Sequence, residues 1–175
     1  MVRKFALIAG AALLAFASPV QAHQSGLSDA QIAHIAYTAG QLDIEAAQQA
    51  LERSQSAEVR AFAETMVRDH RAVNEQALAL LQRLGVTPQE HPTSAALSSQ
   101  AAAERERLAA LRGGAFDRAY AEREAAFHSA VNGALSSTLI PSARNAELKA
   151  LLEAGLALFS AHQEHAEALT RQLRR

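Results

Sequence analysis

The chain has 175 residues, with 17 Lys and Arg against 18 Asp and Glu, so its formal net charge is −1 at pH 7. This near balance argues against a nucleic-acid partner or an anionic membrane surface, both of which select strongly basic proteins. The chain contains no cysteine, which excludes disulfide bonds, thiolate metal sites and redox cysteine pairs. Any metal ligands must therefore come from His, Asp, Glu, Met or Tyr.

The first 22 residues have the pattern of a secretory signal peptide. Arg3 and Lys4 provide the positive start, and the 12-residue apolar run FALIAGAALLAF follows them. A membrane-spanning helix needs about 20 apolar residues, so a retained anchor is the weaker interpretation. The small residues that end at Ala22 predict cleavage after that position. We therefore expect a periplasmic or secreted protein that begins at His23, whose free amine and ring together could chelate copper.

The remaining residues, 23–175, suffice for one domain with an apolar core. Without Arg3 and Lys4 they carry 15 basic and 18 acidic residues, a net charge of −3. Apolar residues recur every three or four positions, and no segment shows the sustained alternation that is typical of strands. The sequence therefore predicts a single all-α domain over residues 23–175.

Start and stop signals divide this domain into four long helices and one shorter helix. Ser28 or Asp29 is a suitable N-cap for the first helix, Ser56 for the second, and Gly85 ends the second. The third, alanine-rich helix stops at Gly113-Gly114, and the fourth ends near Pro141. The predicted ranges are 30–54, 59–84, 94–111, 116 to about 140, and 146–173.

The short helix at 94–111 decides the topology. Its roughly 18 residues extend about 27 Å, enough to carry the chain back along the bundle so that the second and third long helices run parallel. We predict this arrangement: a ferritin-like four-helix bundle with an additional shorter helix in the long connection between helices two and three. A plain up-down-up-down bundle with an extra packed helix is the alternative.

Each long helix carries a polar residue on or beside its apolar stripe. His70 lies near the centre of the stripe of the second helix, where an unpaired polar group would cost about 1–3 kcal/mol. Asp43 is the inward candidate on the first helix, Glu124 and His128 on the third long helix, and His162 on the last. The helical rise places these residues at similar depth, within one or two turns of one another.

Several strings resemble those of a secreted, ferritin-like bacterial family catalogued as domain of unknown function 4142. They are VRAFAETMVRDH around His70, FDRAY at 116–120, and FSAHQEHAEAL around His162. The resemblance covers nearly the whole of residues 23–175 and implies the bundle fold and secretion, whereas the activity of the family is itself uncharacterised. Members generally have Glu where this chain has Asp43.

The di-iron motif of ferritin-like enzymes, Glu-x-x-His on two helices, is missing. Val67 stands three residues before His70, and Phe159 stands three residues before His162. Ferroxidase activity therefore does not follow from the fold. The sequence also has no Gly-rich phosphate loop, G-x-S-x-G elbow or H-E-x-x-H motif, so it favours a protein that is not an enzyme.

Two functions remain open. In the first, a zinc, copper or iron ion binds in the bundle core through the ligands His70, His128, His162, Asp43 and Glu124. In the second, the chain is a non-enzymatic envelope or stress-related protein whose polar core only fixes helix register, with His70 bonded to Asp43 or Tyr120. Protein partners are not indicated by the sequence. Four further residues are expected at the surface: His34, Asp69, His91 and His165.

Overall fold

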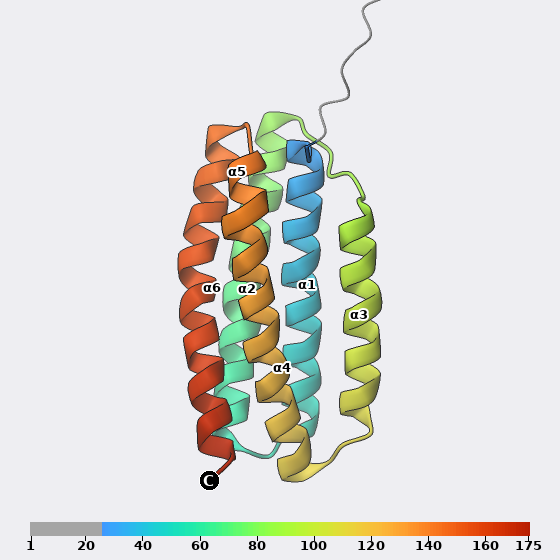
Figure 1. Ribbon diagram of the computed structural model, residues 1–175, viewed down its shortest axis with the longest axis vertical. Helices are drawn as coiled ribbons and strands as arrows, with labels where there is room; N and C mark the ends of the chain where they lie inside the picture. The colour runs from blue at the N-terminus through green and yellow to red at the C-terminus, as the bar shows by residue number, and fades with distance from the viewer. Residues whose placement is uncertain (1–25) are drawn as a thin grey trace, which may run out of the picture.

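The computed structural model describes residues 26–175, which form a bundle of helices (Figure 1). The predicted signal peptide and His23 lie outside the described residues. In chain order the elements are α1 (Asp29–Arg53), α2 (Ala57–Leu84), α3 (Pro92–Ala109), α4 (Gly113–Ala134), η1 (Leu135–Leu139), α5 (Ile140–Ser142) and α6 (Ala146–Leu173). Residues 26–175 contain no strand, so the all-α prediction is confirmed.

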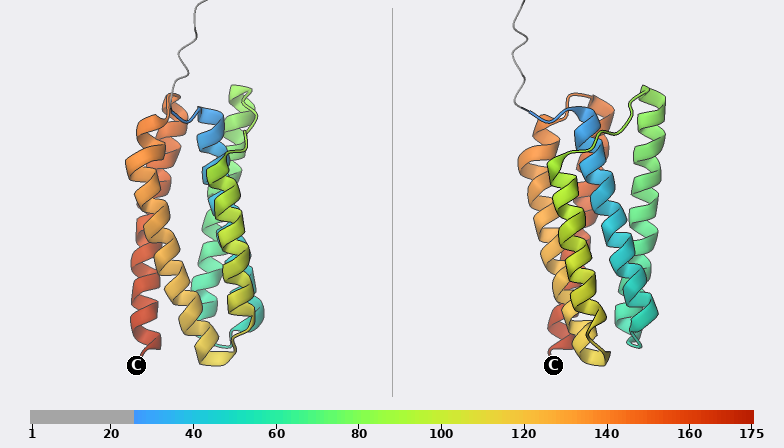
Figure 2. Two further views of the ribbon diagram at one scale, coloured as in Figure 1. Left: turned by 45° about the vertical axis from the view of Figure 1, so that its right-hand side comes forward. Right: turned by 90° about the vertical axis from the view of Figure 1, so that its right-hand side faces the viewer.

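The chain crosses the bundle once through α3, as predicted. In Figure 1, α1 runs downward and α2 upward, α3 returns downward on the outside, and α4 runs upward before α6 descends. Helices α2 and α4 are therefore parallel. Helices α1, α2, α6 and α4 surround the core, while α3 packs mainly on α1 (Figure 2). The long-crossover topology is observed, and the up-down-up-down alternative is wrong.

The helices begin and end where the local signals predict. At the start of α1, Ser28 Oγ accepts the N–H of Gln31 at 3.2 Å, and the Gln31 side chain accepts the N–H of Ser28 at 2.9 Å. Ser56 caps α2 by accepting the N–H of Val59. Gly85 closes α2 with a φ of 63°, a left-handed conformation that a residue without Cβ adopts freely.

The end of α3 differs from the prediction. Gly113-Gly114 opens α4, and α3 already ends at Ala109. Two guanidinium groups bind the carbonyl oxygens of Ala109 and Leu111 here: that of Arg53 on α1, at 2.6 and 2.9 Å, and that of Arg112, at 2.8 and 2.9 Å. These bonds satisfy carbonyls at the end of α3, so the chain can turn there.

A widened turn, η1, joins α4 to α5. Pro141 lacks an N–H, and its ring would clash with the carbonyl four residues earlier in a regular helix. The wider π-type winding of η1 lies just before this proline. It also places Leu135 and Leu139 in the core.

The core consists of two apolar clusters with polar residues between them. The lower cluster, as oriented in Figure 1, contains Ala46, Ala47, Ala50, Val59, Phe62, Ala63, Met66, Leu108, Phe116, Tyr120, Ala121, Ala166 and Leu169. The upper cluster contains Ile32, Ala33, Ile35, Leu80, Leu81, Leu135, Leu139, Leu148, Leu152 and Phe159. At mid-height lies the polar layer, here defined as the buried side chains of Asp43, His70, Arg123, Glu124, His128 and His162.

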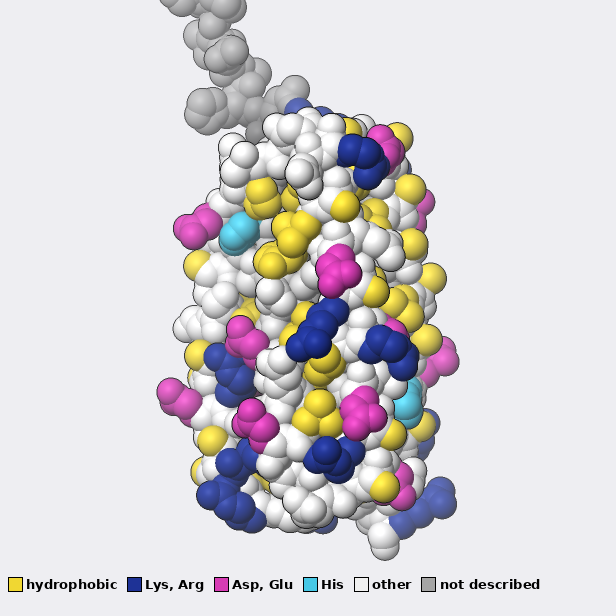
Figure 3. Space-filling model, turned by 180° about the vertical axis from the view of Figure 1, so that it is seen from behind, with side chains coloured by type: hydrophobic (Ala, Val, Ile, Leu, Met, Phe, Trp, Pro, Cys, Tyr) yellow, Lys and Arg dark blue, Asp and Glu magenta, His cyan; other side chains and the backbone are white. Residues whose placement is uncertain are grey.

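The surface is mixed in charge. Figure 3 shows Lys and Arg interspersed with Asp and Glu over the rear face, without a large area of one sign. Of the helices in residues 26–175, none combines the length and apolar character needed to cross a membrane.

Candidate metal centre

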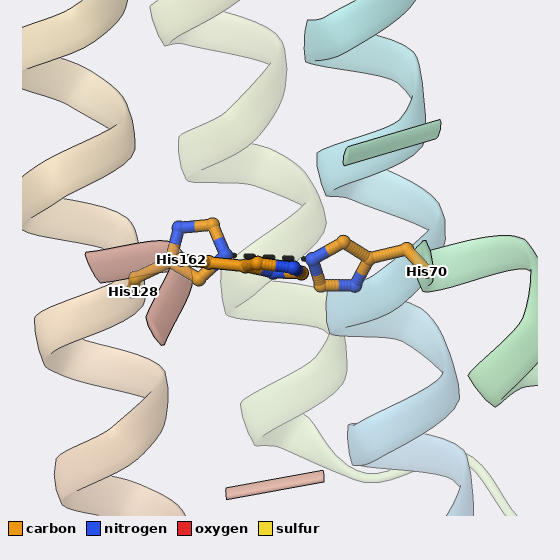
Figure 4. A group of neighbouring side chains, drawn as sticks. All are labelled: His70, His128 and His162. Atoms are coloured by element: carbon orange, nitrogen blue, oxygen red, sulfur yellow. Dashed lines mark hydrogen bonds between the residues drawn. The ribbon is translucent and has the colours of Figure 1, made fainter. Parts of the chain in front are cut away.

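Three histidine rings converge in the polar layer from three helices. α2 supplies His70, α4 supplies His128 and α6 supplies His162 (Figure 4). Their ring centroids are 5.4 to 5.6 Å apart in every pair. Each ring offers one nitrogen that lies within 4.8 Å of the nitrogens offered by the other two.

One nitrogen pair in this group has the spacing of two ligands on one metal ion. At Zn–N distances of about 2.0–2.1 Å, two ligands of a tetrahedral site are about 3.4 Å apart. His70 Nε2 and His128 Nε2 are 3.4 Å apart. Phe159, which occupies the position of the missing glutamate, stacks on the His70 ring with centroids 4.7 Å apart and planes 9° apart. The phenylalanine that stands in place of the di-iron glutamate thus helps to orient the His70 ring.

Hydrogen bonds at the far side of two rings fix which nitrogen is free. His128 Nδ1 lies 3.0 Å from the carbonyl oxygen of Glu124, so this nitrogen donates and the Nε2 lone pair faces His70. His162 Nε2 lies 3.0 Å from Asp69 Oδ2 and donates to it. His162 Nδ1 is buried and has no hydrogen-bond partner among residues 26–175. Metal-binding histidines are commonly held this way, by a carbonyl or carboxylate behind the ring.

Asp69 is a functional candidate that sequence reasoning placed wrongly. We expected it at the surface, but its side chain is only 18% exposed and bridges two helices. Oδ1 accepts from Arg68 at 2.8 Å, and Oδ2 accepts from His162 on α6. Asp69 directly follows Arg68 and precedes His70 in the sequence, which could have indicated a role near the site. The apolar pattern of α2 alone does not show that α6 packs against the side of α2 that carries Asp69.

On the other side of the rings, Arg123 holds two buried carboxyl groups. Its Nη1 donates to Asp43 Oδ1 at 3.0 Å and to Glu124 Oε1 at 2.5 Å. Its guanidinium also covers the Phe127 ring, at 4.3 Å from the centroid. Arg123 was not among the predicted site residues. Arginine is mostly exposed in proteins, so the sequence of α4 alone does not indicate that this side chain is buried.

Asp43 connects this ion-pair group to the histidines. Its Oδ2 lies 3.1 Å from His70 Nε2, and this oxygen makes no well-aligned hydrogen bond within residues 26–175. Asp43, Glu124 and His128 also offer ligand atoms within 4.8 Å of one another. All five residues predicted as ligands therefore lie in one buried layer. Among the residues expected at the surface, His165 is exposed, whereas His34 and His91 are half-buried.

Burial and neighbouring charges set the protonation of the layer. Burial lowers the pKa of His70 to about 4, although Asp43 partly opposes the shift, and burial also lowers the pKa of His128. Burial alone would raise the pKa of Asp43, but His70, His128 and Arg123 outweigh it and lower that pKa to about 2. Burial and the adjacent Asp43 raise the pKa of Glu124 well above its ordinary value.

Burial therefore favours the neutral forms of His70 and His128, Asp43 stays ionised beside Arg123, and Glu124 favours its protonated form. Neutral imidazole is the form that binds metals. The charges of Asp43 and Arg123 cancel each other. The positive charge of a divalent cation would therefore not be balanced by this pair. Because its pKa is raised, Glu124 favours the protonated form, and metal binding can displace such a proton.

Fold and site together define an all-helical bundle with a buried histidine–carboxylate layer, and comparison with known sequences gives the family. The profile described as Domain of unknown function (DUF4142) matches residues 14–169. The chain belongs to this family, as the sequence resemblance implied.

The structure is also similar to a solved one, described as CopM in the Cu(II)-bound form. The TM-score is 0.64 at 15% sequence identity, and the match covers 84% of this chain and 98% of that chain. At this identity the likeness concerns the fold. A search of the curated proteins finds no match.

Proposed function

We propose that this protein binds one transition-metal ion between His70, His128 and His162, with Asp43 next to the ion. One observation carries the proposal. The rings of His128 and His162 each donate one N–H to a group outside the cluster, which leaves His128 Nε2 at 3.4 Å from His70 Nε2 and His162 Nδ1 buried without a partner among residues 26–175. The unpaired lone pair of His162 costs stability unless something uses it.

The ligand chemistry narrows the choice of metal. Imidazole nitrogens with one carboxylate suit zinc, copper or iron and disfavour magnesium and calcium. The structurally similar CopM is described in a Cu(II)-bound form, so copper and zinc are the first ions to test. With the signal peptide that residues 1–22 predict, the ion would be met in the periplasm or outside the cell.

A structural role is the second candidate, and the ion pairs of Arg123 favour it. Arg123 already satisfies one oxygen each of Asp43 and Glu124. In this alternative the layer fixes helix register, and His70 shares its proton with His128 or Asp43. Metal ions would then have no effect on the protein.

Calorimetric titration of the metal-stripped protein with Zn²⁺ and Cu²⁺ separates the two functions. We expect one Zn²⁺ ion per chain for wild type, and at least a tenfold loss of affinity for His162→Ala with either metal at the core site. Any Cu²⁺ held by an N-terminal His23 would not respond to His162→Ala. His165→Ala is the matched control because it lies on the same helix, is exposed and is outside the cluster. Equal binding by the two variants, or no binding by wild type, would exclude the metal centre.

A further inference from the structure

A cavity lies beside the polar layer in the upper half of the bundle. Helices α3 and α4 are close at their lower ends and diverge upward (Figure 2, left). The space bordered by α3 from Thr93 to Arg107, by α4 from Glu122 to Ala134, and by α1, α2 and α6 is a cavity of about 540 Å³. This volume falls within the range of about 300–1,000 Å³ that is usual for small-molecule sites.

The walls of this cavity are mainly apolar. Its deep wall comes from the upper cluster, and includes Ile35, Leu135, Leu152 and Phe159. The exposed residues among its lining, such as Ala130 on α4 and Thr93 on α3, mark the side that opens to solvent. A small apolar molecule could therefore enter between α3 and α4 without unfolding the bundle.

The cavity also borders two buried polar atoms that lack partners. Asn74 is 7% exposed, and its Nδ2 has no hydrogen-bond partner among the described residues. His70 Nδ1 is likewise unpaired within residues 26–175. The Asn74 amide lies against Gly40, where a Cβ would be only 2.5 Å from Asn74 Oδ1. A buried donor without a partner is destabilising, so an acceptor on a ligand would be favoured here.

The charged side chains that line the cavity are already paired with one another or with neighbours. Arg107 binds Glu104 at 2.7 Å, Glu122 binds Arg174 at 2.8 Å, and Arg123 is held by Asp43 and Glu124. A charged ligand would have to displace one of these pairs. An uncharged ligand meets no such obstacle.

We propose that this cavity binds an uncharged, mainly apolar small molecule that carries a carbonyl or hydroxyl oxygen, and that Asn74 Nδ2 donates to that oxygen. The apolar body packs on the upper cluster, and the oxygen lies beside the polar layer. This site adjoins the metal centre, because His70 and His128 also line the cavity. It does not require the ion, since Asn74 and the apolar wall are present without one.

The probe Prodan tests this proposal, because it is uncharged, has a naphthalene body with a ketone, and changes its emission in apolar surroundings. We expect saturable binding to the metal-stripped protein with a blue-shifted emission. Ala36→Phe and Ala130→Phe each place a ring in the cavity and should abolish this binding. Ala102→Phe is the control because this residue of α3 is exposed and does not line the cavity.

Asn74→Leu tests the acceptor contact separately. We expect about a tenfold loss of Prodan affinity, the effect of one hydrogen bond, with metal affinity retained.

Circular dichroism of each variant checks that it is folded. Because Ala130 is exposed, Ala130→Phe fills the cavity without straining the core. Unchanged binding in both phenylalanine variants would overturn the cavity, and an unaffected Asn74→Leu would overturn the contact. If two copies of the chain form a dimer and Prodan binds only after dilution dissociates it, the cavity between α3 and α4 would instead be an interface between the copies.

Discussion

Asp43 and Glu124 both accept hydrogen bonds from Arg123, yet their pKa values move in opposite directions. One positive charge cannot hold two carboxylates ionised in a buried layer. Asp43 keeps the negative charge because His70 and His128 also lie beside it, and Glu124 takes the proton. Asp43 and Arg123 thus neutralise each other, and Glu124 remains beside them as an acid able to ionise.

The protonation of Glu124 predicts how the stability of the metal-free protein depends on pH. Because its folded pKa is raised above the ordinary 4.5, its contribution is lost as pH rises above that value. His70, whose pKa is lowered from 6.5 to about 4, has the opposite effect, but only below about pH 6.5. Above about pH 6.5, where His70 no longer contributes a change, the melting temperature should therefore fall until Glu124 is ionised in the folded protein as well.

Glu124→Gln should remove this slope and raise the melting temperature at pH 8, because Gln stays neutral and can still accept from Arg123. Thermal unfolding in the presence of a chelator at several pH values measures both effects. A variant less stable than wild type at pH 8 would show that Glu124 is ionised in the folded protein.

Asp69 should matter for the metal and little for the fold. Its carboxylate accepts from His162 Nε2 and so orients the ring and makes it more basic. Asp69→Ala should lower metal affinity about 10- to 100-fold, the usual effect of removing such a partner. Glu64→Ala, at an exposed position of the same helix, is the control. If both variants bind metal like wild type, His162 is not a ligand.

At the scale of whole helices, Gly40 of α1 lies directly against the Asn74 side chain of α2. Gly40→Ala would gain about 1 kcal/mol of helix propensity, but the new Cβ would push against Asn74 Oδ1 at 2.5 Å. Gly133 lies in α4, and a Cβ added there would have no neighbouring atom within 4 Å. Gly133→Ala should therefore raise the free energy of unfolding by about 0.5–1 kcal/mol, and Gly40→Ala should fall short of that gain.

Combining Gly40→Ala with Asn74→Ala should restore the missing stability, because the obstructing amide is gone. Chemical denaturation of the single and double variants measures the coupling between the two positions. Additive effects would mean that the two helices do not constrain each other here.

The elements that the sequence predicts well are those decided within one helix. Periodic apolar residues and the caps Ser28, Ser56 and Gly85 place α1 and α2 correctly, and the length of the third helix indicates the crossover. The features that escaped prediction depend on contacts between helices. Asp69 is partly covered because its carboxylate accepts from His162 on α6, and Arg53 of α1 donates to a carbonyl at the end of α3.

Across the whole molecule, the polar layer separates two apolar clusters, so most of the stability should reside outside the site. Phe62 is fully buried in the lower cluster. Phe62→Ala should lower the free energy of unfolding by about 3–5 kcal/mol, measured by chemical denaturation. A folded variant should keep its metal stoichiometry because Phe62 is not a ligand. A loss under about 1 kcal/mol would mean that the lower cluster is not packed as described.

The central claim is that three histidine nitrogens face one metal ion, and nitrogen NMR of the imidazole rings tests it most directly. In the metal-free protein at neutral pH, His128 should carry its proton on Nδ1 and His162 on Nε2. One equivalent of Zn²⁺ should then shift the resonances of His70 Nε2, His128 Nε2 and His162 Nδ1, with His34, His91 and His165 unchanged. If Zn²⁺ leaves the three core rings unchanged, or shifts only the other histidines, the proposed metal centre is contradicted.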